Sequence, residues 1–150
     1  MTPQGKEHRI THIGVCVSDL DRAVAFYRDG LGFVERARLT VEGGVSERLL
    51  RVSELDLDMV YLEHSGLRIE LLHFRSPGLE GGDSTPPVNR VGFTHFSIRV
   101  DVLGPMLDRI ISTGGQVDRQ SYVVFEGGNS GIMAFDPDGT RIELIERVEA

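Results

Sequence analysis

Two short sequences occur once in each half of this 150-residue chain. Thr-His occupies residues 11–12 and again 94–95, each time at the start of an apolar stretch, and Arg-Ile-Glu-Leu occupies residues 68–71 and 141–144. Each half therefore supplies one histidine and one glutamate, in the same order, on strand-like segments. The repetition predicts a duplicated unit that carries half of a site in each copy.

The composition limits the classes of partner. The chain is 40% hydrophobic and 26% charged, which is typical of a globular protein. Its formal net charge is −7 and its Lys and Arg residues are scattered, so we expect no nucleic-acid partner. No apolar run approaches the roughly 20 residues of a membrane helix, and residues 1–7 contain no apolar signal core. These features predict a cytoplasmic protein with no membrane partner.

The first half is predicted to begin with a strand and a helix and to continue with further strands. Ser18 or Asp19 is a suitable N-cap for the helix, and Ser65-Gly66 predicts a hairpin turn. The single cysteine, Cys16, lies on the first strand, and we expect it to be a buried small hydrophobe. The expected strands are residues 10–17, 31–40, 49–52, 57–63 and 67–74.

Glycine and proline crowd residues 76–90, and this stretch is interpreted as a linker. The second half then repeats the order of the first, with a helix that Asp101 is expected to cap. Its expected strands are residues 93–100, 122–125, 132–135 and 140–146, and residues 116–119 are expected to form a short edge strand or a loop.

The four repeated polar residues suggest a metal site. If the first and last strands of each half lie side by side, His12 can face Glu70, and His95 can face Glu143. When the two half-sheets fold toward one another, all four side chains can converge in a cleft. Imidazole nitrogen and carboxylate oxygen suit a divalent Zn, Ni, Co, Mn or Fe ion. We treat the remaining histidines, His8, His64 and His73, as non-ligands.

Four segments resemble the vicinal oxygen chelate superfamily of glyoxalases, bleomycin-resistance proteins and dioxygenases. They are ITHIGVCVSDLDRAVAFYRDGLGF, LRIELLHF, VGFTHFSIRV and AFDPDGTRIELIE. The resemblance implies an α+β fold in which two βαβββ modules form a curved mixed sheet around a metal-binding cleft, often in a homodimer. It places the family's ligand positions on His12, Glu70, His95 and Glu143, and it leaves open whether the site forms within one chain or across a dimer.

The resemblance also suggests a domain organisation. We expect residues 1–150 to form a single domain, with one module at about residues 8–75 and the other at about residues 92–147. The linker between them would occupy about residues 76–91.

The ligand set is similar to that of bacterial glyoxalase I, whereas the Ile-Glu-Leu-Leu stretch is similar to that of methylmalonyl-CoA epimerases. Leu71-Leu72-His73-Phe74 stands where glyoxalases usually carry Asn, Trp and Gly. The expected function is therefore a metal-dependent lyase or isomerase of the glyoxalase type, with an epimerase as the alternative. The substrate would chelate the metal through two vicinal oxygens and lose a proton α to a carbonyl, through an enediolate or enolate. Glu143 is the expected base, and Glu70 remains a ligand or serves as the partner acid or base.

Three other functions stay open. An iron(II) extradiol dioxygenase would use His12, His95 and Glu143 as a two-His-one-carboxylate triad, but Glu70 would then fill a position that oxygen or catechol needs. A fosfomycin-type transferase would add a thiol to an epoxide. A non-catalytic protein that binds an antibiotic or another small molecule would need no metal.

Overall fold

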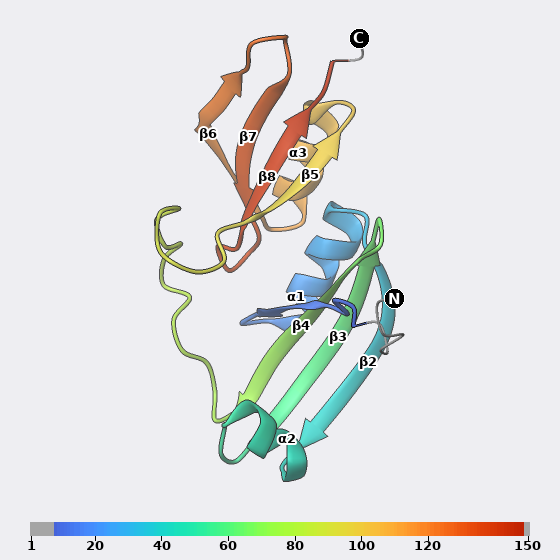
Figure 1. Ribbon diagram of the computed structural model, residues 1–150, viewed down its shortest axis with the longest axis vertical. Coiled ribbons are helices and arrows are strands. Elements are labelled where there is room, and N and C mark those ends of the chain that lie inside the picture. Colours follow the sequence, from blue (N-terminus) through green and yellow to red (C-terminus); the bar gives the residue numbers. More distant parts are fainter. Residues whose placement is uncertain (1–7, 149–150) are drawn as a thin grey trace, which may run out of the picture.

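Each half of the chain forms its own four-stranded mixed sheet (Figure 1). The structure is a computed structural model that describes residues 8–148, so the N-terminal stretch 1–7, for which no signal core was predicted, lies outside the described residues together with 149–150. In Figure 1 the sheet of the second half lies above that of the first. The predicted α+β class and the two βαβββ modules are confirmed.

The first sheet has the order β1-β4-β3-β2. Strands β1 and β4 are parallel, and the other neighbours are antiparallel. The strands are β1 (Ile13–Cys16), β2 (Val34–Glu42), β3 (Asp56–His64) and β4 (Leu67–Ser76). The first and last strands of this module are therefore neighbours, as predicted.

The second sheet repeats this arrangement with the order β5-β8-β7-β6, and β5 is parallel to β8. Its strands are β5 (Phe96–Val100), β6 (Gln116–Val124), β7 (Ser130–Phe135) and β8 (Arg141–Glu146). Residues 116–124 form one strand, where the sequence predicted a short edge strand or loop at 116–119 and a separate strand at 122–125. The irregular register between Asp118 and Val123 explains the difference, because a bulge interrupts the alternation without ending the strand.

Helix α1 (Leu20–Ala25) begins after Asp19, whose side chain accepts a hydrogen bond from the backbone N–H of Arg22 at 2.9 Å, as an N-cap should. It continues as a π-helix, η1 (Phe26–Gly30). Helix α3 (Leu103–Ser112) begins after Val102 rather than after the predicted cap Asp101. The carboxylate of Glu146 accepts the N–H of Leu103 at 2.6 Å and replaces a local cap.

The strand predicted for residues 49–52 is wrong. These residues belong to or follow α2 (Gly44–Leu50), a short helix that buries none of its residues. The Glu47 carboxylate accepts the N–H of Leu55 at 2.9 Å, and the Glu47 carbonyl accepts the N–H of Val52 at 3.2 Å. These contacts hold residues 47–55 in a compact turn. The strand prediction rested only on three apolar residues among the four at 49–52, which carry no signal of these contacts.

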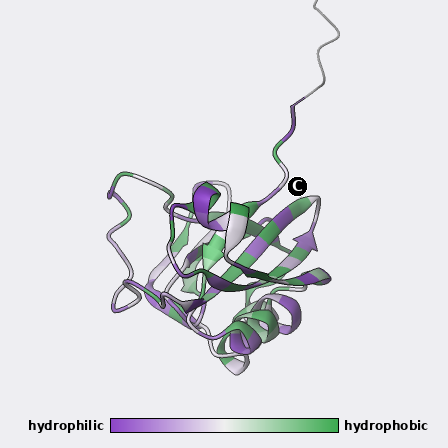
Figure 2. Ribbon diagram, turned by 90° about the horizontal axis from the view of Figure 1, so that it is seen from below, coloured by the Kyte–Doolittle hydropathy of each residue, from purple (hydrophilic) through white to green (hydrophobic). Residues whose placement is uncertain are grey.

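One hydrophobic core extends across both modules, from Phe26 and Tyr27 on η1 to Ile110 on α3 and Leu144 on β8. Figure 2 shows hydrophobic and hydrophilic residues alternating along the strands, so that each sheet presents one apolar face. Tyr27 is fully buried, and its hydroxyl donates to the Asp136 carboxylate at 2.9 Å. The modules are thus fixed relative to each other by apolar packing and a buried hydrogen bond.

The segment between β4 and β5 runs along the outside of the molecule (Figure 1). It is fastened where the Thr85 hydroxyl donates to the carbonyl of Gly139 at 2.8 Å. Among the helices of residues 8–148, none is long and apolar enough to cross a membrane.

Candidate metal centre

The first half-site lies at the edge of the first sheet. His12 directly precedes β1, and Glu70 lies on β4, opposite Gly14 of β1. Successive side chains of a strand alternate between faces, so His12 and Gly14 share the face that Glu70 presents. The Nε2 atom of His12 lies 2.9 Å from Oε2 of Glu70. The predicted pairing of this histidine with this glutamate is therefore present.

The threonine of each Thr-His pair contacts the histidine ring. Thr11 Oγ1 lies 3.0 Å from Nδ1 of His12, and Thr94 Oγ1 lies 2.8 Å from Nδ1 of His95. With Nδ1 occupied by the hydroxyl, Nε2 is the nitrogen left to face a ligand. In each repeated Thr-His pair the threonine hydroxyl thus fixes the orientation of the histidine ring.

A tyrosine completes the first half-site. The hydroxyl of Tyr61, on β3, donates to Oε1 of Glu70 at 2.8 Å, and its ring meets the His12 ring edge-on at 5.5 Å between centroids. Burial raises the pKa of Tyr61 most, and its hydrogen bond to Glu70 and that carboxylate's charge raise the pKa further. The phenol therefore remains protonated and donates near neutral pH.

The second half-site has the same plan with looser contacts. His95 precedes β5, Glu143 lies on β8, and their Nε2 and Oε2 atoms are 3.8 Å apart. Ser97 of β5 donates its hydroxyl to Oε1 of Glu143 at 2.8 Å. The Glu143 side chain is 31% exposed, compared with 11% for Glu70.

The donor atoms suit a divalent transition metal. Two ligand atoms that bind the same ion at about 2.0–2.2 Å lie about 3 Å from each other when they are neighbours in its coordination shell. The 2.9 Å separation in the first half-site matches this value, and the 3.8 Å separation in the second needs only a small adjustment. Each half-site thus offers one imidazole nitrogen and one carboxylate oxygen that face each other.

The two half-sites do not meet within one chain. Among residues 8–148, no three His, Cys, Asp or Glu side chains gather closely enough to hold a metal ion. The sequence left open whether the four residues converge within one chain or across a dimer, and they do not converge among residues 8–148 of the single chain. The reason lies in the packing between the modules, which joins them through η1 and α3 and leaves their ligand-bearing edges apart.

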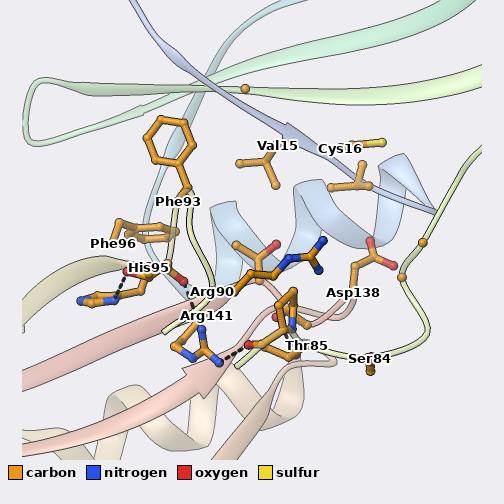
Figure 3. Close-up of a pocket in the computed structure, with 18 of the residues that line it drawn as sticks. Val15, Cys16, Ser84, Thr85, Arg90, Phe93, His95, Phe96, Asp138 and Arg141 are labelled. Carbon is orange, nitrogen blue, oxygen red and sulfur yellow. Dashed lines mark hydrogen bonds between the residues drawn. The ribbon is translucent and has the colours of Figure 1, made fainter. Parts of the chain in front are cut away.

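A pocket of about 670 Å³ lies between β1, the linker and the segments that precede β5 and β8. Figure 3 shows Val15 and Cys16 on one side of it and His95, Arg90 and Asp138 on the other. His95 is the single member of the four that lines it. The pocket therefore borders the second half-site without containing either His–Glu pair.

The two arginines of the repeated sequence have different contacts. Arg68 pairs with Glu63 on the surface, at 3.2 Å. Arg141 donates to the carbonyls of Thr94, at 3.4 Å, and Pro86, at 2.6 Å, the bonds drawn around it in Figure 3. Arg141 therefore fastens the residue before His95 to β8, whereas the ion pair of Arg68 links the two strands of its own hairpin.

Cys16 is exposed, contrary to the prediction of a buried residue. It lies on an edge strand, so that its side chain has no covering strand on one side.

Two of the histidines treated as non-ligands have protein partners instead. His73 Nδ1 lies 3.0 Å from the carbonyl of Val17, and His64 Nδ1 lies 2.7 Å from the Ser65 hydroxyl.

The sequence interpretation missed Tyr61 and Ser97, although both left a signal. A two-residue turn at Ser65-Gly66 pairs residue 64 with residue 67, and the same register places Tyr61 opposite Glu70. Ser97 follows His95 by two residues and so lies on the same face of its strand. The predicted turn and the period of the strand would have found both.

The protein-family comparison agrees with this architecture. The model of the Glyoxalase/Bleomycin resistance protein/Dioxygenase superfamily matches residues 9–144. A glyoxalase family protein from Bacillus cereus has a similar fold, with a TM-score of 0.86 and 22% identity over 99% of this chain and 100% of that one. Glyoxalase I of Leishmania major also has this fold, with a TM-score of 0.64, 22% identity, and coverage of 93% and 87%.

Several curated relatives are named lactoylglutathione lyase. The protein from Salmonella typhimurium is 34% identical in an alignment that covers 95% of each chain. The one from Haemophilus influenzae is 31% identical in an alignment that covers 92% of each chain. The putative lactoylglutathione lyase of Brassica oleracea var. gemmifera is 30% identical over 146 residues. These residues are 97% of this chain, but the chain spans only 46% of that longer relative.

Proposed function

Because the chain belongs to the Glyoxalase/Bleomycin resistance protein/Dioxygenase superfamily, we propose that it is a metal-dependent lyase or isomerase of the glyoxalase type. The observation that carries this proposal is the pair of His–Glu half-sites, each with an imidazole Nε2 facing a carboxylate Oε2. The relatives named lactoylglutathione lyase, which cover nearly the whole chain, support the same class of reaction. The proposed ligands are His12, Glu70, His95 and Glu143.

A divalent Zn, Ni, Co, Mn or Fe ion held by these residues would act as a Lewis acid toward two vicinal oxygens of a small substrate. Glu143 is the proposed base, which takes up the proton α to the carbonyl on its carboxylate and returns it to the neighbouring carbon. Its side chain is the more exposed of the two carboxylates, and its Oε2 lies farther from its histidine. Glu70, held at both oxygens, is the proposed permanent ligand.

We propose that a second copy of the chain completes the site. The ligand-bearing strands lie at one edge of each sheet, since β1 and β5 are terminal in the strand orders β1-β4-β3-β2 and β5-β8-β7-β6. Placing the β1 edge of one copy beside the β5 edge of another would bring His12 and Glu70 next to the second copy's His95 and Glu143. A twofold symmetric dimer would contain two such sites.

Exposed apolar side chains beside these two edges support the dimer. Ile10, before β1, is 91% exposed, and Phe93, before β5, is 98% exposed. Val91, two residues before Phe93, is fully exposed as well. Large apolar side chains gathered beside an unpaired sheet edge are typical of an interface.

The reaction can be tested with the hemithioacetal that forms from methylglyoxal and glutathione. We expect metal-loaded protein to convert it to the thioester, and chelated protein to lose this activity and regain it when Ni²⁺ or Zn²⁺ is added. A hemithioacetal of a different thiol should be tested in parallel, because residues 71–74 differ from the usual glyoxalase sequence. A protein that binds no divalent metal would contradict the proposal.

The dimer can be tested by mixing two inactive variants, His12→Ala and Glu143→Gln. If each site uses module 1 of one copy and module 2 of the other, a mixed dimer contains one intact site and one doubly damaged site. After full subunit exchange half of the dimers are mixed, and one of the two sites in each mixed dimer is intact. The mixture should therefore regain about a quarter of wild-type activity. A site formed within one chain would give no recovery.

The alternatives from the sequence can be separated with the same preparation. Oxygen uptake with catechols after iron(II) loading would indicate a dioxygenase. Proton exchange at an α-carbon without formation of a thioester would indicate an epimerase, and addition of a thiol to an epoxide would indicate a transferase. Tight binding of a small molecule by metal-free protein would favour a binding protein.

A further inference from the structure

The carboxylates of the two half-sites are held from opposite sides. Glu70 of β4 pairs with Gly14 of β1 and Tyr61 of β3, so its hydroxyl donor comes from β3. Glu143 occupies the corresponding position in the second sheet, where its neighbours across the register are Ser97 of β5 and Met133 of β7. Its donor therefore comes from β5, the edge strand, and the β7 side offers only a thioether.

In both half-sites the hydroxyl binds one oxygen of the carboxylate and leaves the other for the histidine. Oε1 of Glu70 accepts from Tyr61 and Oε2 faces His12, whereas Oε1 of Glu143 accepts from Ser97 and Oε2 faces His95. A carboxylate with one oxygen occupied by a hydrogen bond presents its other oxygen as a single metal-binding atom.

We propose that Tyr61 and Ser97 are positioning residues with different tasks. Tyr61 fixes Glu70 as a permanent metal ligand, and Ser97 aligns Glu143 while leaving it free to move as the base. This inference rests on the proposed function, because it assigns roles to residues that touch the proposed ligands.

The surroundings of Tyr61 account for a rigid ligand. Its ring packs edge-on against His12, and the Arg68 guanidinium lies 6.0 Å from the ring centroid on another side. The phenol therefore has little freedom to turn, and its hydroxyl reaches Glu70 from a strand in the interior of the sheet. The Glu70 side chain is only 11% exposed, so its carboxylate has little room to exchange this contact for water.

The surroundings of Ser97 account for a movable base. Ser97 is exposed on an edge strand, and a serine hydroxyl reorients about a single side-chain bond. The Glu143 side chain is almost one-third exposed and lies 3.8 Å from His95 rather than in close contact. Glu143 can therefore shift toward a substrate while Ser97 follows it.

The test for Tyr61 is the Tyr61→Phe variant, which keeps the ring and removes only the hydroxyl. We expect its dissociation constant for Zn²⁺, measured by competition with a chromogenic chelator, to rise about 10- to 100-fold, as is typical when an outer-shell partner is lost. The visible spectrum of the Co²⁺-loaded protein should also change, since it reports on the ligand geometry.

The matched control is Tyr122→Phe, an exposed tyrosine on β6 outside both half-sites. Its Zn²⁺ affinity and Co²⁺ spectrum should equal those of the wild type. If Tyr61→Phe, folded by circular dichroism, also binds Zn²⁺ within about twofold of the wild type, the role of Tyr61 is refuted. A wild type that binds no Zn²⁺ would instead refute the proposed function.

The test for Ser97 compares Ser97→Ala with Ser97→Thr. We expect Ser97→Ala to lower kcat about tenfold with little change in KM, and to weaken Zn²⁺ binding less than Tyr61→Phe does. Ser97→Thr keeps the hydroxyl and should restore kcat. Ser53→Ala, at an exposed position away from the site, is the control. Equal losses of Zn²⁺ affinity in Tyr61→Phe and Ser97→Ala, or an unchanged kcat in Ser97→Ala, would overturn the division of roles.

Discussion

The two half-sites are built from the same short sequences but differ in how firmly they are held. In the first, Glu70 is buried and its Oε2 lies 2.9 Å from the Nε2 of His12. In the second, Glu143 is partly exposed and lies 3.8 Å from His95. The repeated residues are identical, so the difference comes from their neighbours: a tyrosine on an interior strand holds one carboxylate, and a serine on an edge strand holds the other. Duplication thus supplied two equivalent donor pairs, and the surrounding strands made them unequal.

The largest expected effect is on the base. Glu143→Gln removes the carboxylate that accepts the proton but keeps the shape of the side chain, so kcat for thioester formation should fall about 10²- to 10⁴-fold. Metal content, measured by elemental analysis, should fall far less. Glu70→Gln is the companion variant. It should lose mainly metal affinity, while the kcat of its metal-loaded form should fall less than that of Glu143→Gln. Normal turnover in Glu143→Gln would contradict the assignment of the base.

Loss of either histidine should have the next largest effect, and it tests whether the half-sites contribute equally. His12→Ala and His95→Ala each remove one imidazole donor. We expect the Zn²⁺ dissociation constant to rise by more than the roughly 10- to 100-fold that outer-shell changes produce. His73→Ala, whose ring contacts the Val17 carbonyl instead, is the control. Unchanged metal content in His12→Ala or His95→Ala would remove that residue from the ligand set.

The threonines should give a smaller effect that is similar in both halves. Thr11→Val and Thr94→Val remove the hydroxyl that lies 3.0 or 2.8 Å from Nδ1 of the adjacent histidine. Each should weaken Zn²⁺ binding about tenfold, because the imidazole loses the contact that sets its orientation. Thr11→Ser and Thr94→Ser keep the hydroxyl and should bind Zn²⁺ like the wild type. If the serine variants are as weak as the valine variants, the hydroxyl is not responsible.

The smallest effects concern the two arginines of the repeat. Arg68→Gln removes an exposed ion pair with Glu63 and should change the free energy of unfolding by less than about 0.5 kcal/mol. Arg141→Gln removes two bonds to backbone carbonyls, of Thr94 and Pro86, and should cost about 1–2 kcal/mol. Urea unfolding monitored by circular dichroism measures both. Equal effects would mean that Arg141 does not fasten the second half-site.

Much of this arrangement was predictable because it depends on local pattern. The alternation of apolar residues predicted most of the strands, and Asp19 was one of the two caps predicted for the first helix. The errors occurred where distant residues decide local structure. Helix α2 depends on the contact of Glu47 with Leu55, and α3 is capped by Glu146 from β8 rather than by the adjacent Asp101.

The sequence by itself determined which residues we propose as metal ligands and how they pair. The repeats place one histidine and one glutamate in each half, and the period of a strand directs them to one face. Only the tertiary structure decided that the two pairs lie apart within residues 8–148 and that Tyr61 and Ser97 hold the carboxylates from opposite sides. The physical reason is that side-chain direction follows from local backbone geometry. Strand order and the packing of one module on the other depend instead on contacts between residues far apart in the chain.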